Sequence, residues 1–126
     1  MGLDNIVYKQ VAVEDKRLAE ALAPLCGGML TDGANSFRGK VYSDLVEAIT
    51  DHDLYSTDEW TWSTMDQVVK SFEDIILEDK VQSWLDDYNS SKENVWNIKY
   101  SKEEFMALYK VFKLCSDEGW SINAWY

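Results

Sequence analysis

Apolar residues recur at helical spacing over much of this chain. The clearest series occupies positions i, i+3, i+4, i+7, i+10 and i+11, namely Met65, Val68, Val69, Phe72, Ile75 and Ile76. One face of an α-helix repeats at this spacing, so the series predicts a helix of about three turns over residues 65–76. Ser63 and Thr64 precede the series as candidate N-cap residues.

Four further segments have helical patterns. Two of them cover residues 14–23 and 40–50. A third apolar face, over residues 81–88, follows either as a kinked continuation of the 65–76 helix or as a separate helix. The last helix begins at a capping box, in which Ser101 and the Glu104 carboxylate each satisfy the other's amide, and it ends near Gly119.

Strand patterns lie near both ends of the chain. Residues 5–13, 95–100 and 120–126 favour short strands, and residues 26–39 read as a loop. Pro24 is the one proline, and no linker or repeat divides the chain. We therefore expect an α+β fold: a helix-rich single domain over residues 1–126, with a small antiparallel sheet formed by the terminal segments and residues near 95–100. Seven residues are the predicted core: Val69, Phe72, Ile76, Leu85, Phe105, Leu108 and Phe112.

Composition and charge narrow the classes of function. Hydrophobic residues make up 46% of the chain, which is too many for a disordered acidic tail. The net charge of −11 argues against direct binding to nucleic acid or to an anionic membrane surface. The chain shows neither a signal-peptide pattern nor an apolar run of the roughly 20 residues that a membrane helix needs, so we expect a cytoplasmic protein. Cys26 and Cys115 are expected to be reduced, buried thiols, with a single disulfide as the alternative.

The charge is concentrated in the middle of the chain. Residues 1–42 and residues 94–126 each carry equal numbers of acids and bases. Residues 43–93 carry fourteen acids and three lysines, so the whole net charge of −11 lies there. A concentrated field of this kind attracts a basic partner and speeds its encounter. The alternative is that the acids serve only to keep the protein soluble.

Aromatic residues are interleaved with these acids. Because Trp and Tyr are favoured interface anchors, Trp60 and Trp62 are candidate anchors for a protein partner, with burial in the core as the alternative. The predicted partner-binding residues are Asp44, Glu47, Asp51, Asp58, Glu59, Trp60, Trp62, Asp66, Glu73, Asp74 and Glu78.

The glycine-containing segment 33–41 suggests a second kind of site. It fails as a nucleotide-binding P-loop, because five residues separate its glycines and Val41 follows the lysine. Two bases nevertheless precede a predicted helix N-terminus, where backbone amides favour an anion. The predicted ligand-binding residues of this alternative are Asn35, Ser36, Arg38 and Lys40, and the ligand would be small and phosphate-bearing.

Catalytic and metal chemistry have weaker support. His52 is the single histidine, and two flanking aspartates without a second histidine do not predict a metal site. Nothing local pairs Cys26 with His52 as a nucleophile and its base. We therefore expect no catalytic residues, no metal and no cofactor.

A resemblance covers about the first third of the chain. The opening Met1-Gly2-Leu3-Asp4 and the block from Cys26-Gly27-Gly28 to Ser36-Phe37-Arg38-Gly39-Lys40-Val41-Tyr42 resemble small uncharacterised proteins of phages and bacteria, cyanobacteria among them. The resemblance implies a phage-encoded or phage-defence-related binding protein.

Together the residues predict a non-enzymatic, acidic interaction protein. Its partner is expected to be a basic protein of the nuclease or nucleic-acid-binding type, which it binds and inhibits. The carboxylates of residues 43–93 either imitate the phosphate array of DNA or simply complement the partner's basic surface. A small-ligand binder built on Arg38 and Lys40 is the alternative.

Overall fold

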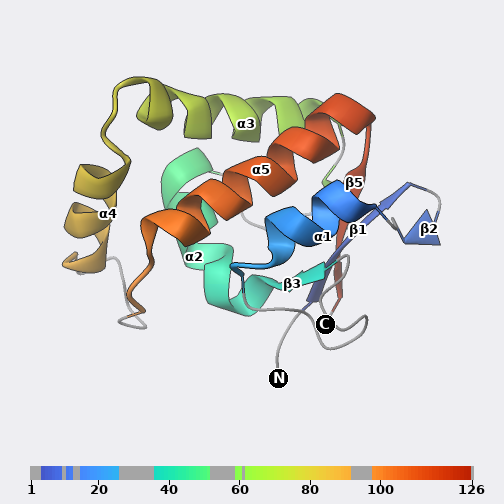
Figure 1. Ribbon diagram of the computed structural model, residues 1–126, viewed down its shortest axis with the longest axis horizontal. Coiled ribbons are helices and arrows are strands. Elements are labelled where there is room, and N and C mark those ends of the chain that lie inside the picture. The colour runs from blue at the N-terminus through green and yellow to red at the C-terminus, as the bar shows by residue number, and fades with distance from the viewer. Residues whose placement is uncertain are drawn as a thin grey trace.

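The fold is dominated by helices. The computed structural model describes residues 4–9, 11–12, 15–25, 36–51, 59–60, 62–91 and 98–125, with the backbone alone at residues 36–41, 59–60 and 62–64 and in most strand positions. The helices are α1 (Lys16–Leu22), α2 (Gly39–Thr50), α3 (Trp62–Leu77), α4 (Val81–Asn89) and α5 (Lys102–Glu118). Figure 1 shows α5 crossing the molecule, with α3 along one side of it, α1 along the other and α4 at one end.

The predicted α+β class is wrong. Where the structure describes side chains, the chain is 75% helical, with five helices and no complete strand. Val7 and Ile122 are the strand residues among the buried apolar side chains described, and the rest of that core comes from the helices and their flanking turns. The core therefore forms by helix-on-helix packing rather than by helices covering a sheet.

Short strands are described at the level of the backbone. They are β1 (Asp4–Lys9), β2 (Val11–Ala12), β3 (Ser36–Arg38), β4 (Glu59–Trp60) and β5 (Ser121–Trp125). β1 pairs antiparallel with β5, which in turn pairs with β4, while β2 and β3 also pair with β1. The strand predicted over residues 5–13 is therefore not continuous, because Lys9 of β1 pairs antiparallel with Val11 of β2.

The predicted strand at residues 95–100 is the clearest local error. Residues 98–100 are not in a strand, and 95–97 lie outside the described residues. The Asn89 side chain occupies the position of a neighbouring strand: its Nδ2 donates to the Tyr100 carbonyl at 3.0 Å, and its Oδ1 accepts from the Tyr100 amide at 3.0 Å. A single amide side chain at the end of α4 thus satisfies both backbone groups that a strand would pair.

Several helix boundaries follow from local chemistry. The capping box is confirmed, since Ser101 Oγ accepts from the Glu104 amide at 3.1 Å and Glu104 Oε1 accepts from the Ser101 amide at 3.2 Å. The Asp15 carboxylate caps α1 by accepting from the Arg17 amide at 2.8 Å. Ser63 and Thr64 are not N-caps, because α3 already begins at Trp62. The predicted loop over 26–39 is wrong at residues 36–39, which form β3 and the first residue of α2, and residues 26–35 lie outside the described residues.

The break between α3 and α4 is a closed helix end. Asp79 adopts a left-handed φ of 55°, its amide donates to the Ile76 carbonyl, and the Lys80 amide donates to the Ile75 carbonyl. These two bonds satisfy carbonyls at the C-terminus of α3, as in a Schellman motif. The two apolar patterns therefore belong to separate helices rather than to one kinked helix.

Helical periodicity located the core well. Six of the seven predicted core residues are buried, and the seventh, Ile76, packs against them while partly exposed. The Phe72 ring lies between those of Phe105 and Phe112, with centroid separations of 5.0 and 5.6 Å. α3 and α5 are joined through these rings, and this junction holds the acidic face of α3 in place.

Candidate functional site

Acidic side chains are concentrated on α2, α3, α4 and the turns that follow them. Residues 43–51, 59–60 and 62–91 contain eleven Asp and Glu, and their bases are Lys70 and Lys80. On α2, Asp44 is half-buried and Glu47 is exposed, and Asp51 is exposed directly after the helix. These three predicted partner-binding residues are therefore accessible to different degrees.

Two of the predicted carboxylates also hold the fold together. Glu73 on α3 accepts a hydrogen bond from the Tyr109 hydroxyl of α5 at 2.8 Å, and Asp66 accepts one from the Ser116 hydroxyl at 3.0 Å. Burial, followed by the bond to Glu73, raises the pKa of Tyr109 to about 12. Glu73 and Asp66 thus tie α3 to α5, which gives them a structural role that charge counting does not reveal.

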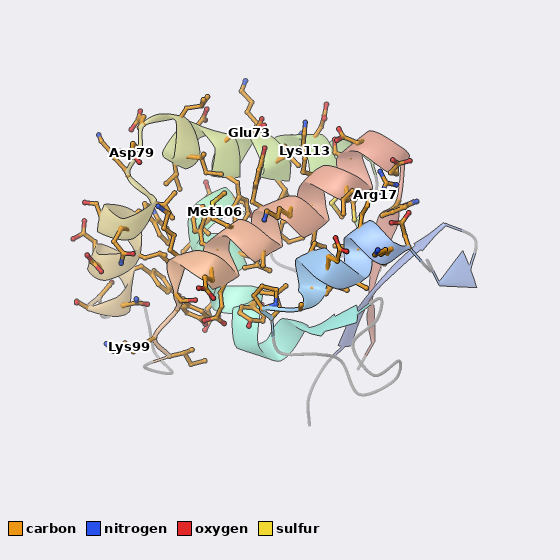
Figure 2. All side chains as sticks on the ribbon, in the orientation of Figure 1. Arg17, Glu73, Asp79, Lys99, Met106 and Lys113 are labelled. Carbon is orange, nitrogen blue, oxygen red and sulfur yellow. The ribbon has the colours of Figure 1, made fainter. Side chains whose placement is uncertain are left out.

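The junction of α3 and α4 combines acids with an exposed apolar side chain. We call Asp74, Leu77, Glu78 and Asp79 the α3–α4 corner. Leu77 is 82% exposed, and it is the large hydrophobic residue most open to solvent among those described. Its three acidic neighbours are all exposed, and Figure 2 shows Asp79 at the outer edge of this turn.

The charges of the corner are little compensated. Glu78 forms an ion pair with Lys80 at 3.3 Å, between two well-exposed side chains. Asp74 and Asp79 form no ion pair with the bases that the structure describes. The three carboxylates of the corner outnumber the paired Lys80, so the corner keeps a negative field.

Leu77 is a surface residue that was not predicted from the sequence. The signal was nevertheless present, because Leu77 directly follows Ile76 and falls outside the i, i+3, i+4 series that ends there. An apolar residue off the buried stripe of an amphipathic helix points to solvent. The structure therefore adds an apolar contact point to the predicted acidic surface.

A hollow between α2 and α4 places an aromatic ring beside a carboxylate. It has a volume of about 290 Å³ and its lining includes Ala48, Trp84 and Asp87. Trp84 stacks on Tyr88 with a centroid separation of 5.4 Å and an interplanar angle of 9°. A carboxylate in a hollow that an indole also lines is suited to a side chain with an apolar stem and a cationic end.

Other predicted site residues are described partly or not at all. Asp58 and Asn35 lie outside the described residues, as do His52 and Cys26. The backbone alone is described for Glu59 and Trp60 in β4, Trp62 at the start of α3, Ser36 and Arg38 in β3, and Lys40 in α2. The anchoring role of the two tryptophans and the convergence of Arg38 and Lys40 on an anion stay predictions.

Cys115 is a free, buried thiol whose pKa is raised to about 12 by burial, so it is a poor nucleophile near neutral pH. Among the described residues, no group of three or more His, Cys, Asp or Glu is arranged to hold a metal ion. Within the same part of the chain, no helix combines the length and apolar character needed to span a membrane.

Comparisons with known proteins do not extend this picture. No protein-family model, curated protein or solved structure matches the chain. The functional argument therefore depends on the residues and their geometry.

Proposed function

We propose that this protein is a non-enzymatic, acidic interaction protein. Its partner is a basic protein of the nucleic-acid-binding or nuclease type, and binding inhibits that partner. One observation supports the proposal: the described part of residues 43–91 contains eleven carboxylates and only two lysines. Most of these carboxylates are exposed, and they occur on three successive helices and their turns.

The proposed mechanism is competitive occlusion. Carboxylates on α2, α3 and α4 present negative charges to the surface that the partner uses for phosphates, and their field speeds association. Leu77 and Trp84 provide apolar contacts that slow dissociation, because buried apolar and aromatic groups carry most of the energy of a protein interface. A cationic side chain of the partner fits the hollow beside Asp87.

Neutralising exposed acids that do not tie α3 to α5 tests this proposal. The variant is Asp74→Asn, Asp86→Asn and Asp87→Asn, and the control is Glu20→Gln with Glu103→Gln, which changes exposed acids outside the middle segment. Proteins retained from lysate at low and high salt are identified, and the basic ones are purified for binding kinetics. We expect at least a tenfold fall in the on-rate for the variant and less than a twofold change for the control.

Leu77→Ala and Trp84→Ala test the apolar contacts separately. Both should mainly raise the off-rate, while the on-rate keeps its salt dependence. The proposal is wrong if no basic protein is retained in a salt-sensitive manner, or if the neutralised variant binds the same partner at the wild-type on-rate. Solubility would then account for the charge.

A further inference from the structure

The hollow between α2 and α4 has one wall from each helix. Ala48 lies on α2, while Trp84, Asp87, Tyr88 and Ser91 lie on α4 or directly after it. Trp84, Asp87 and Tyr88 have the spacing i, i+3 and i+4, so they share one face of α4. We call this feature the α2–α4 hollow.

The size of the α2–α4 hollow suits a single side chain. Its volume of about 290 Å³ is at the lower limit of the roughly 300–1,000 Å³ that is typical of small-molecule sites. Its lining combines the exposed Ala48 and the half-buried indole of Trp84 with the exposed carboxylate of Asp87. An occupant should therefore have an apolar stem and end in a group that donates to a carboxylate.

The Asp87 carboxylate has no partner of its own among the described residues, with which it forms neither a hydrogen bond nor an ion pair. The adjacent Asp86 differs, because its Oδ1 accepts from Gln82 Nε2 at 2.9 Å and it does not line the hollow. The acceptor atoms of Asp87 are therefore available to an occupant, and Asp86 provides a control at the next position.

The surroundings of the hollow are negatively charged. Residues 42–51 and 81–91, which form its two sides, contain five acids and no lysine or arginine. Two described lysines lie next to these segments without lining the hollow: Lys80 is paired with a neighbouring carboxylate, and Lys99 donates to the Asn89 carbonyl at 2.7 Å. The C-terminal end of α4 thus already binds an ammonium group of the chain, as the negative end of a helix dipole favours.

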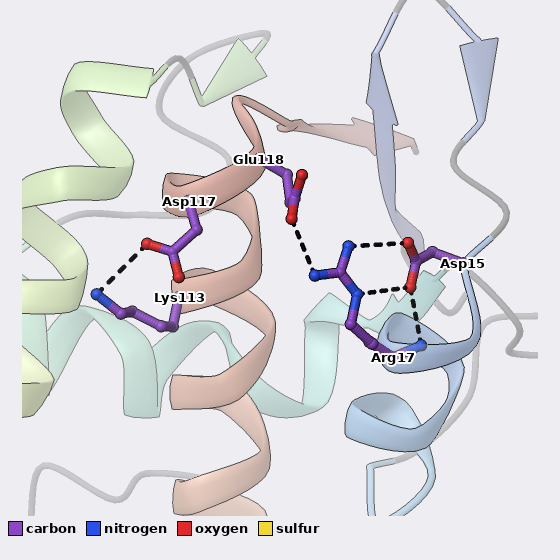
Figure 3. Close-up of polar contacts among 5 residues, drawn as sticks. All are labelled: Asp15, Arg17, Lys113, Asp117 and Glu118. Atoms are coloured by element: carbon purple, nitrogen blue, oxygen red, sulfur yellow. Dashed lines mark hydrogen bonds and ion pairs between the residues drawn. The ribbon is translucent and has the colours of Figure 1, made fainter.

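The bases described on α1 and α5 do not line the hollow either. Figure 3 shows two of them in ion pairs: Arg17 with Asp15 and Glu118 at 3.1 and 2.9 Å, and Lys113 with Asp117 at 3.4 Å. Acids and bases therefore offset one another between α1 and α5, whereas the α2–α4 hollow holds a carboxylate and no described base.

We propose that the α2–α4 hollow binds one arginine side chain of the basic partner. The apolar stem lies between Ala48 and Trp84, and the guanidinium group donates to both oxygens of the Asp87 carboxylate. This inference rests on the proposed function, and it deepens it by naming the side chain that the acidic surface recognises.

Arginine fits this place better than lysine does. A guanidinium group is planar, and its fork of N–H donors matches the two oxygens of a carboxylate. It is also more weakly hydrated than an ammonium group, so it loses less on entering a partly apolar hollow. A lysine would form only an exposed ion pair with Asp87, and such pairs contribute little.

Titration of the full chain with two small probes tests the hollow without any partner. The probes are N-acetyl-arginine methylamide and N-acetyl-lysine methylamide, and binding is followed through the NMR signals of the labelled protein. The arginine probe should cause saturable shifts at Ala48, at the Trp84 indole and at Asp87. It should bind at least about fivefold more tightly than the lysine probe.

Three variants make the test specific. Asp87→Asn should weaken binding of the arginine probe at least about fivefold, whereas Asp86→Asn, the same change one residue earlier, should bind it as the wild type does. Ala48→Met keeps the charge and a good helix former but fills the hollow, so it should abolish saturable binding. All three positions are exposed, and the same spectra show whether each variant folds.

Kinetics on the basic partner extend the test. Asp86→Asn and Asp87→Asn remove equal charges and should lower the on-rate alike. Only Asp87→Asn and Ala48→Met should also raise the off-rate.

Three outcomes overturn the proposal: arginine-probe shifts that do not saturate or that lie elsewhere, a lysine probe that binds as tightly, or an Ala48→Met variant that binds the arginine probe as the wild type does. None of them changes the salt-sensitive retention of a basic protein. Failure to retain any basic protein would contradict the proposed function and not the affinity of the hollow for arginine, which the probe measures directly.

Discussion

Individual residues with left-handed backbone conformation end three of the helices. Asp51, Asp79 and Gly119 have φ values of 60°, 55° and 70°, and they follow α2, α3 and α5. Glycine adopts this conformation freely, whereas a side chain with a Cβ atom is strained in it. The three positions therefore share one backbone geometry, but it strains the backbone at Asp51 and Asp79 and not at Gly119.

Gly119→Ala should lower the free energy of unfolding by about 1 kcal/mol, because the added Cβ atom disfavours the left-handed conformation. No atom lies within 4 Å of the place that this Cβ would take, so the loss reflects the backbone alone. Asp79→Gly is the converse change and should raise the free energy of unfolding. Urea denaturation measures both, and equal effects of the same sign would contradict this account.

At the level of elements, hydroxyl–carboxylate bonds tie α3 to α5. The Tyr109 hydroxyl donates to Glu73, and burial together with this bond raises the pKa of Tyr109 to about 12. An unfolded tyrosine has a pKa of about 10, so the folded state holds this proton more tightly. The contribution of Tyr109 to stability is therefore complete below about pH 10 and is lost as the pH rises toward 12.

Tyr109→Phe should reduce the fall in thermal midpoint between pH 9 and pH 11. The variant should also be less stable than the wild type at pH 7, by about 1 kcal/mol, because a partly exposed hydrogen bond to a carboxylate is lost. Thermal melts at several pH values measure both effects. Burial also raises the pKa values of Tyr100 and Cys115, so the variant keeps part of the alkaline loss. A slope identical to that of the wild type would contradict the role of Tyr109.

The elements show what sequence patterns could predict. The helices carry long amphipathic series and the Ser101–Glu104 capping box, which are local signals that need no tertiary information. The segment near 95–100 had β-branched and aromatic residues but no such signal. Whether it pairs as a strand depends on a distant group, and Asn89 satisfies both backbone groups of Tyr100 instead. The α+β class failed because the helices supply nearly all of the described core, and because the segment near 95–100 relied on pairing that the sequence does not encode locally.

The candidate site was predictable in charge but not in geometry. The acidic excess of residues 43–93 could be read from the sequence, and the exposure of Asp74 follows from helical periodicity. The bonds by which Asp66 and Glu73 tie α3 to α5 could not be predicted from the sequence, because their partners, Ser116 and Tyr109, lie 50 and 36 residues away. Neither could the approach of Trp84 and Asp87 to α2, because it depends on how two helices pack.

For the whole molecule, the acids that tie α3 to α5 and the acids that form no bond to another helix give opposite predictions for stability. Asp74→Asn, Asp86→Asn and Asp87→Asn remove repulsion from a protein of net charge −11, and each like-charge contact that is relieved returns a few tenths of a kcal/mol. The triple variant should therefore be more stable than the wild type by about 0.5–1 kcal/mol at low salt. Adding salt screens the same repulsion, so the advantage should shrink between 50 and 500 mM NaCl.

The double variant Asp66→Asn with Glu73→Gln also removes two negative charges. It should nevertheless destabilise the protein by about 1 kcal/mol or more, because the Ser116 and Tyr109 hydroxyls lose their charged acceptors. Urea denaturation of the wild type and both variants at the two salt concentrations separates the effects. If both variants are stabilised, the hydroxyl bonds contribute nothing net and the acids act only through repulsion. If neither is stabilised, the carboxylates of Asp74, Asp86 and Asp87 cost the fold nothing, and a contact surface on α3 and α4 can retain them without loss of stability.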